Sequence, residues 1–319
     1  MNRSVLVLAE LLILGAASPV FAAYSSAIVY GYDATTGSTV VQDGETSLLG
    51  EHVQASLGSV PGYGFSGSAE AEARAYSSVG GRAEVSDPLS FRDHYAIGAS
   101  GEANSVVRFH AMKTGTVIYS VALNADLSVN VDTVYANQAS IQGGTGMRWT
   151  YGYPFPWNPV SGSGWNGGAT LSYSSSGGLA MQTGGLDEAE YAYNSSGQGS
   201  VSATRSFLVE LPKADVDYEL TLGLNAGAAA DSRYGANDAF GSTNAMNSLG
   251  FPGDFYDIVG GTASFYDLDD PSRTYNIPEP SSFALAFSLL ALLCVVLGRW
   301  RWRHRSEANV LRASVVNSQ

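Results

Sequence analysis

The side chains that could catalyse a reaction are few and widely spaced along this chain. The histidines are His52, His94, His110 and His304, and none stands in the H-E-x-x-H spacing that binds zinc on a helix. No G-x-S-x-G sequence marks a nucleophilic serine. A triad built in space from His94, a distant Asp and a serine stays open, because triads depend on geometry and not on chain order. We therefore expect a protein without catalytic residues, with an extracellular hydrolase as the third hypothesis.

Carboxylates gather in three short segments, each of which could bind a cation. The segments contain Asp215, Asp217 and Glu219, then Asp187, Glu188 and Glu190, and then Asp267, Asp269 and Asp270. Acids on one strand face repel one another unless a cation or solvent separates them, so an oxygen-ligated Ca²⁺ site is one interpretation. No segment has the EF-hand spacing. We favour a solvated acidic edge that opposes strand-to-strand aggregation, with no resident metal and no cofactor.

One glycine motif matches a dinucleotide-binding pattern. Gly62, Gly64 and Gly67 fit G-x-G-x-x-G, and residues 68–75 follow them. The pattern requires a helix after the glycines within a βαβ unit. The alternation of Ala and Glu in residues 68–75 also suits a strand with small residues inward, and no βαβ series follows. We therefore do not expect nucleotide binding.

A segment rich in Gly, Pro and Trp, residues 143–168, has the composition of a binding loop. Three prolines within residues 154–159 prevent a regular strand or helix there. Aromatic rings can stack on the apolar faces of sugars. The candidates for such stacking are Trp149, Tyr151, Tyr153, Trp157 and Trp165, with Asn158 or Asn166 to hold sugar hydroxyls. The alternative, which we favour, is that the rings close one end of the hydrophobic core.

The elements that must position these side chains are β-strands. Apolar residues alternate with polar or small ones from Val117 to Val131, and again from Val216 to Leu224. Such alternation is typical of strands with one buried face. The first run exceeds the usual ~3–10 residues of a strand, so we expect a bend or a break into two strands. The fold class that we predict is mainly β, with an antiparallel β-sandwich-like body.

The two alternating runs have similar surroundings. Each follows another apolar-rich stretch, residues 106–112 in one case and 206–211 in the other, across a short turn that contains a lysine. This match predicts a duplicated hairpin and two related β units. We expect the first β unit in residues 24–142, the loop region in 143–168 and the second β unit in 169–276.

The overall composition limits the classes of partner. Charged residues make up only 14% of the 319 residues, against a usual share of about a quarter. Residues 24–276 contain 10 Lys or Arg and 26 Asp or Glu, a net charge of −16. This charge argues against nucleic acid, which needs clustered Lys and Arg. The single cysteine, Cys294, lies outside this region, so the body must fold without a disulfide.

Residues 1–23 predict a secretory signal peptide. Arg3 supplies a positive start, Val5 to Ile13 an apolar stretch, and Ala16 to Ala23 a cleavage zone of mostly small residues. The apolar stretch is shorter than the ~20 residues that span a bilayer, which argues against a permanent anchor. We expect the mature chain to begin near Tyr24.

The opposite end predicts a membrane span. Residues 281–298 form an apolar segment long enough for a helix to cross a thin bilayer. A basic cluster follows in residues 299–305 and contains Arg299, Arg301, Arg303 and Arg305. Positive residues stay on the cytoplasmic side, so the tail, residues 306–319, is expected in the cytoplasm and the body across the membrane.

Pro278, Glu279 and Pro280 stand directly before this span. With it and the arginines, residues 277–305 resemble the PEP-CTERM sorting signal of Gram-negative bacteria. The resemblance implies export, an inner-membrane intermediate with the body in the periplasm, and cleavage near the motif by an exosortase. It also implies association with exopolysaccharide and biofilm matrix. The same signature carries the label of an ice-binding protein C-terminal domain, although the body has no regular Thr-rich repeat.

These features together predict an exported, exosortase-sorted protein of the cell surface or extracellular matrix, with a structural or display role. The expected partners are an exosortase-type enzyme, the inner membrane and, as a candidate, exopolysaccharide. The alternative function is an extracellular carbohydrate-binding module that uses the aromatic residues of 149–165.

Overall fold

The computed structural model describes residues 23–33, 36, 38–58, 66–74, 77–87, 95–131, 136–152, 155–231 and 239–275. These residues belong to one unit that ends at Tyr275, and residues 276–319 form a second unit. The predicted signal peptide up to Ala22, the sorting signal, the membrane span and the tail therefore lie outside the described residues. Within the described ranges, no helix combines the length and apolar character needed to cross a membrane.

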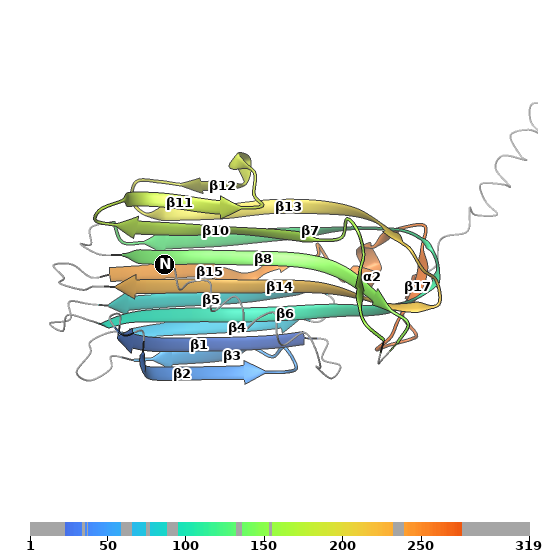
Figure 1. Ribbon diagram of the computed structural model, residues 1–319, viewed down its shortest axis with the longest axis horizontal. Helices are drawn as coiled ribbons and strands as arrows, with labels where there is room; N and C mark the ends of the chain where they lie inside the picture. Colours follow the sequence, from blue (N-terminus) through green and yellow to red (C-terminus); the bar gives the residue numbers. More distant parts are fainter. Residues whose placement is uncertain are drawn as a thin grey trace, which may run out of the picture. The chain divides into compact units, whose positions relative to one another are not determined.

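The described strands form two antiparallel sheets (Figure 1). Sheet A contains, from one edge to the other, β11 (Gly178–Gly184), β10 (Trp165–Ser174), β8 (Asn137–Thr150), β14 (Val216–Asp231), β6 (Tyr95–Lys113), β1 (Ala23–Asp33) and β2 (Thr39–Ser47). Sheet B contains β12 (Tyr191–Tyr193), β13 (Gln198–Leu211), β7 (Gly115–Val129), β15 (Ala239–Gly250), β5 (Ser78–Asp87), β4 (Ser66–Arg74) and β3 (Val53–Leu57). The short strands are β9 (Asn158–Pro159), β17 (Ser264–Asp267) and β18 (Thr274–Tyr275) in sheet A, and β16 (Gly260–Gly261) in sheet B. The predicted mainly antiparallel β class is confirmed.

The two sheets pack face to face, with β14 and β6 of sheet A against β15, β5 and β4 of sheet B. Alternate residues of each strand fill the space between them. On β7, Val117, Tyr119 and Val121 are buried, whereas Ile118 is exposed on the other face. Leu220 on β14 is buried in the same way. The predicted alternation is therefore confirmed, and the arrangement agrees with a β-sandwich.

The long strand β7 is continuous, so of the bend or break expected in this run, the break into two strands is wrong. It runs from Gly115 to Val129 and pairs with β13 at every position from Gly115 to Ser128. A neighbour of nearly equal length satisfies the backbone hydrogen bonds along the strand. The usual strand length is an average, and it does not limit a strand with such a partner.

The predicted hairpins are also wrong, because the two strands of each run lie in different sheets. β6 lies in sheet A and β7 in sheet B, while β13 lies in sheet B and β14 in sheet A. The first crossing uses Gly115, with φ +155°, where a Cβ would lie 2.7 Å from the backbone of Thr262. The second uses Asp215, which adopts a left-handed φ of 56°. Alternation identifies the buried face of a strand but does not identify its neighbour.

The two runs nevertheless correspond to each other in three dimensions. β14 lies between β6 and β8 in sheet A, and β7 lies between β13 and β15 in sheet B. The consecutive strands β6, β7 and β8 form one set of three, and β13, β14 and β15 form another. Each set thus inserts its middle strand between the two outer strands of the other set. Tyr218 stacks on Phe109 with 5.3 Å between ring centroids, and Tyr119 stacks on Phe207 with 4.9 Å. Residues 24–142 and 169–276 therefore interleave in both sheets, and residues 143–168 contain the end of β8 and the start of β10.

Side-chain size changes along the core. Phe255 of the one-turn helix α2 (Phe255–Ile258) is buried at an aromatic end, where its ring contacts Phe109, Tyr119, Phe251 and Phe265. Under β1, β4 and β5 the buried residues are mostly alanine and valine. The sheets approach closely there, since a Cβ on Gly101 of β6 would lie 2.1 Å from the carbonyl oxygen of Glu70 on β4. This close approach explains part of the high alanine and glycine content.

Candidate functional site

The candidate site lies on the outer face of sheet A, near one end of β6, β14 and β8. We call it the charged cluster, and it contains Arg108 and His110 of β6, Asp217 and Glu219 of β14, and Arg148 of β8. Strand register places His110 beside Asp217, and places Glu219 between Arg108 and Arg148. Pairing between strands that are distant in the sequence therefore assembles the cluster.

Each acid of the charged cluster contacts an arginine or a histidine. Arg148 Nε donates to Glu219 Oε1 at 2.8 Å, and Arg148 Nη2 donates to the same oxygen. His110 Nδ1 lies 2.8 Å from Asp217 Oδ1, and its ring stacks on Tyr266 with 5.1 Å between centroids. Arg108 Nη2 donates to Asp269 Oδ1 at 2.9 Å, which brings β17 and its following turn to the cluster. The acids Asp217 and Glu219 thus have cationic or imidazole neighbours.

An aromatic loop leaves the end of β8 beside the charged cluster. Tyr151 and Phe155 are each 59% exposed, and Trp157 is 37% exposed. We call these three residues the loop rings. The hydroxyl of Thr150 donates to the carbonyl oxygen of Phe155 at 3.1 Å, and this bond holds the loop. The Arg148 guanidinium lies 4.8 Å from the centroid of the Trp157 ring, so the loop and the cluster are in contact.

The five aromatic residues predicted to stack on sugars lie in different environments. Tyr151 and Trp157 are exposed among the loop rings, whereas Trp149 is partly buried against the core. Trp165 lies on β10, where its Nε1 donates to the carbonyl oxygen of Gly185 at 3.1 Å, and Arg205 lies 5.4 Å from its ring centroid. Tyr153 lies outside the described residues. Core closure thus describes Trp149, whereas Tyr151 and Trp157 are exposed to solvent.

The two asparagines predicted to hold sugar hydroxyls are also separated. Asn158 is the first residue of β9 and directly follows Trp157. Its Nδ2 donates to the carbonyl oxygen of Pro156 at 3.3 Å. Asn166 lies on β10, where its Oδ1 accepts from Gln142 Nε2 at 3.4 Å. Only Asn158 adjoins the loop rings.

The other two acidic segments are bound by arginines or backbone. Glu190 accepts from Arg205 Nη2 at 2.6 Å, and this contact lowers the pKa of Glu190 and raises that of Arg205. Asp267 is buried, and its Oδ1 accepts the backbone N–H groups of Asp269 and Asp270. Desolvation raises the pKa of Asp267 despite these bonds. Among the residues that the structure describes, no three His, Cys, Asp or Glu side chains are grouped as a metal ion requires.

The dinucleotide pattern is followed by a strand. Gly67 itself lies within β4, which runs from Ser66 to Arg74 and on which Ala69, Ala71 and Ala73 are buried. Gly62 and Gly64 lie outside the described residues. The alternation of small and acidic residues is thus confirmed as a strand pattern, and the helix that a phosphate site needs is not formed there.

The pair of His110 and Asp217 has one feature of hydrolase sites, a histidine held by a carboxylate. The hydroxyl next to Asp217 in the register belongs to Thr150, which is buried and donates to the carbonyl oxygens of Gly152 and Phe155. That hydroxyl is therefore turned to the loop backbone. His52 lies 3.8 Å from Glu70 at the surface of sheet B, and His94 lies outside the described residues.

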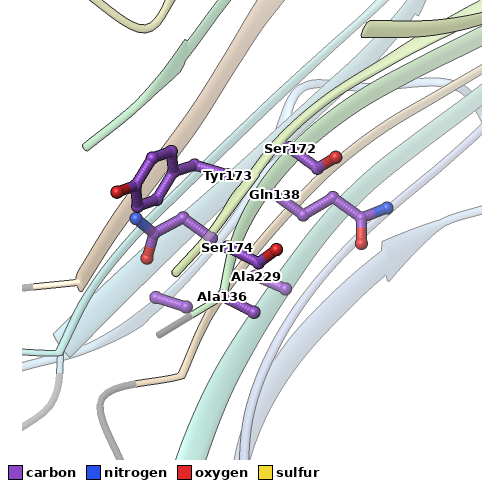
Figure 2. Close-up of a pocket in the computed structure, with 8 residues that line it drawn as sticks. Ala136, Gln138, Ser172, Tyr173, Ser174 and Ala229 are labelled. Atoms are coloured by element: carbon purple, nitrogen blue, oxygen red, sulfur yellow. The ribbon is translucent and has the colours of Figure 1, made fainter. Parts of the chain in front are cut away.

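Two hollows in the described surface lie away from the charged cluster. The first, about 210 Å³, is at the opposite end of β8 and includes Gln138, Ser172 and Tyr173 in its lining. Gln138 and Ser172 point to one side and Tyr173 to the other, so this hollow lies across the ends of the strands (Figure 2). The second, about 340 Å³, lies on β7, β13 and β15 and includes Asp126 and Asn244.

The outer face of sheet A between the charged cluster and the first hollow is polar. Glu102 of β6 lies beside Asn225 of β14, which in turn lies beside Gln142 of β8. Desolvation raises the pKa of Glu102, and a 3.4 Å hydrogen bond from Asn104 Nδ2 opposes this shift. The face therefore presents amide groups and a carboxyl group whose proton is held more tightly than usual.

No model of a known protein family matches this chain, and no curated protein matches it. The site is therefore interpreted from its own geometry. Sequence reasoning did not single out Arg108, Arg148 or Phe155, because Arg148 stands 71 residues from its partner Glu219. The only local signal was their position on the solvent side of alternating strands or within the aromatic segment.

Proposed function

We propose that this chain is an exported, non-catalytic protein of the cell surface or extracellular matrix, sorted by its PEP-CTERM-like signal. The extent of the two sheets supports this proposal most directly. β1 begins at Ala23, where the signal peptide would end, and β18 ends at Tyr275, shortly before Pro278. Removal of both processing segments would take only Ala23, the first residue of β1, from the described strands.

The body also has the properties that an exported protein needs. It contains no cysteine, so its stability does not depend on disulfide formation. Two stacked sheets and an aromatic cluster around Phe255 bury a core of a size that can support folding without cross-links. The net charge of −16 over residues 24–276 favours solubility after release.

Mass analysis of the native protein tests the sorting proposal. Intact masses are measured in culture supernatant and in membranes of the host, for the parent chain and for the triple variant Pro278→Ala, Glu279→Ala, Pro280→Ala. We expect a body that begins near Tyr24 and ends near Pro280 in the parent, and loss of C-terminal trimming in the variant. A matched control, Glu210→Ala with Pro212→Ala, changes the same residue types within the body and should be trimmed normally.

Two results would contradict the proposal. The parent chain could be found only at full length in the membrane, which would indicate a plain anchor. A compartment-sensitive reporter fused after Asn276 could also report the cytosol, which would overturn the export of the body.

The exposed loop rings favour carbohydrate as a ligand of the body, and this is our second proposal. Tyr151, Phe155 and Trp157 present flat apolar surfaces to solvent, beside the planar groups of Arg148 and Glu219. Planar polar groups next to an aromatic ring are suited to bind a sugar through its hydroxyls and its apolar face together.

Affinity electrophoresis in gels that contain the host's exopolysaccharide tests this second proposal. We expect Trp157→Ala to weaken retardation by at least about tenfold in dissociation constant, because the stacking area of this ring is lost. Leu208→Ala is the matched control, since Leu208 is 68% exposed on the outer face of sheet B. Two results would contradict carbohydrate binding by the loop rings. The parent, Trp157→Ala and Leu208→Ala could be retarded equally, or the parent could show no retardation.

A further inference from the structure

The strand orders of the two sheets end in four edge strands among the described residues, and three of these resist pairing with another chain. β2 carries Asp43 and Glu45, whose carboxylates accept the backbone N–H groups of Ser56 at 2.8 Å and Gln54 at 2.9 Å on β3. These bonds occupy donors of β3 and place two negative charges on β2. Charges and occupied donors at a sheet edge oppose addition of a further strand.

The third protected edge is β12. It has only three residues and directly follows the single-turn helix η2 (Glu188–Glu190). Arg205 binds Glu190 of this helix, so the connection that leads into β12 is fixed against β13. A short edge of this kind offers few hydrogen bonds to another chain.

The fourth edge, β11, lacks these protections. Its residues, Gly178–Gly184, include no charged residue and no proline, and they pair with β10 without a bulge. Within the part of the chain that the structure describes, β11 has a neighbouring strand on one side only. Leu179 and Met181 pack against the core but are only partly buried. A regular, uncharged and half-apolar edge strand is a template for pairing with another chain.

We propose that β11 pairs antiparallel with β11 of a second copy of this chain, which joins sheet A of the two molecules into one continuous sheet. Two-fold symmetry requires the antiparallel direction, because the same surface must meet itself. With the axis at Met181, Leu179 of one copy faces Thr183 of the other, and Ala180 faces Gln182. Met181 faces its own counterpart on the core side, so pairing covers apolar atoms that a single copy leaves open.

The charge of the molecule limits where a second copy can bind. Two bodies of net charge −16 repel each other, so they can meet only where no acid opposes another acid. Antiparallel β11 strands meet this condition, and the two-fold axis places the Asp187 and Glu188 residues of the two copies at opposite ends of the contact. A cationic partner would instead be attracted to edges that carry acids, such as β2. Repulsion between the bodies predicts a weak association that added salt strengthens.

This inference is independent of the sorting signal and of carbohydrate binding. It concerns contacts between folded bodies, and it would link neighbouring molecules wherever they are displayed at high density. Failure of either proposal above would leave it standing, and its own test uses different residues.

Single cysteines placed along β11 test the pairing and its register. The intact chain carries Cys294→Ser, and one of the substitutions Leu179→Cys, Ala180→Cys, Met181→Cys, Gln182→Cys or Thr183→Cys is added. Residues directly opposite in an antiparallel pair have Cβ atoms about 4.5–5.5 Å apart, within reach of a short thiol cross-linker. We expect the highest yield of cross-linked dimer at position 181, and a yield lower by at least about fivefold at positions 179 and 183.

The control is Leu208→Cys, which is exposed on sheet B and should give little dimer. Association through the predicted membrane span is common to all variants and cannot produce a maximum at one residue of β11. Equal yields at all five positions, or no dimer at position 181, would overturn the proposal. A maximum at another residue of β11 would overturn the register centred on Met181.

A charged substitution gives a second test that does not depend on cross-linking. Sedimentation velocity of the intact chain in detergent, at low and high NaCl, compares the parent with Met181→Lys and with Gln182→Lys. We expect the dissociation constant of the dimer to rise at least about tenfold in both variants, with unchanged circular dichroism. Ile118→Lys, on the outer face of sheet B, should dimerise as the parent does. Parent-like association of both β11 variants, or a parent dimer that salt weakens, would contradict the proposal.

Discussion

The two sides of the molecule end their sheets by different means. On the β2–β3 side, carboxylates from sheet A accept backbone N–H groups of sheet B, so the two edge strands protect each other. On the β11–β12 side, Arg205 binds Glu190 and also donates to the carbonyl oxygen of Gly185 at 3.3 Å. Its charge holds the connection between the two sheets but does not reach the edge of β11. The difference between the two sides shows that the position of the charged side chains determines which edge strands remain open to pairing.

The largest expected effect comes from removing Arg205. Arg205→Ala loses the charge-assisted bonds to Glu190 and the cation over Trp165, and because the pair is partly exposed we expect a loss of about 2 kcal/mol in the free energy of unfolding. Urea unfolding measures this loss, and hydrogen exchange should accelerate most in residues 185–193. Arg205→Lys keeps the charge without the bidentate geometry. Its free energy of unfolding should therefore lie between those of the parent and of Arg205→Ala. Parent-like exchange in Arg205→Ala would mean that another contact holds the connection.

Acid should weaken the same side by a smaller amount. The bond from Arg205 lowers the pKa of Glu190, so ionised Glu190 stabilises the folded chain above the ordinary carboxyl pKa. That contribution is lost as the pH falls through the lowered pKa of the folded state. Urea midpoints of the parent and of Glu190→Gln, measured at pH 7, 5 and 3, should therefore converge at the lowest pH. A constant difference between the two chains would show that ionisation of Glu190 is not involved.

Removing the acids of the β2–β3 side should make it resemble the β11 edge. Asp43→Ala with Glu45→Ala frees the N–H groups of Ser56 and Gln54, and because water replaces the lost bonds we expect a loss of about 1 kcal/mol. Light scattering should show stronger concentration-dependent association, since β3 donors become available. Asp126→Ala with Glu210→Ala makes the same change in net charge elsewhere and should not associate. Asp43→Asn with Glu45→Gln removes the two charges but keeps an acceptor oxygen at each position. This variant therefore separates the effect of hydrogen bonding from the effect of charge.

The smallest effect on stability comes from placing an acid on β11. Gln182→Glu should change the free energy of unfolding by less than about 0.5 kcal/mol, because residue 182 is exposed. It should nevertheless raise the dissociation constant of the β11 dimer at least about tenfold, as Gln182→Lys does, since it adds a charge at the edge, as Asp43 does on β2. Gln182→Ser is the neutral control. Unchanged association of Gln182→Glu would mean that charge does not distinguish the two sides.

Much of the strand pattern could be predicted, and the connections between strands could not. Val117, Tyr119 and Val121 alternate with more polar residues, and their burial follows from this period of two. The same pattern led to two hairpins, although Gly115 and Asp215 turn the chain from one sheet to the other. A turn that joins neighbouring strands and a turn that crosses between sheets have similar lengths and similar residues, so local sequence does not separate them.

The candidate site shows the same division. The aromatic segment drew attention to Tyr151 and Trp157 because its prolines prevent regular structure, and both are exposed. Trp165 belongs to the same segment, but its indole N–H donates to the carbonyl oxygen of Gly185, the residue that follows β11. Composition locates a group of rings, whereas the neighbours of each ring decide whether it can meet a ligand.

The sequence by itself determined the β class of the body, the buried side of its long strands and the absence of cysteine from it. These properties are local, because alternation and composition depend on residues that are close along the chain. The tertiary structure alone decided which strands are neighbours, and with them the pairing of Arg148 with Glu219, the protection of β3 by Asp43 and Glu45, and the open edge of β11. The physical reason is that backbone hydrogen bonds between strands are nearly the same for every sequence. The choice of neighbour is therefore made by packing and charge over the whole fold.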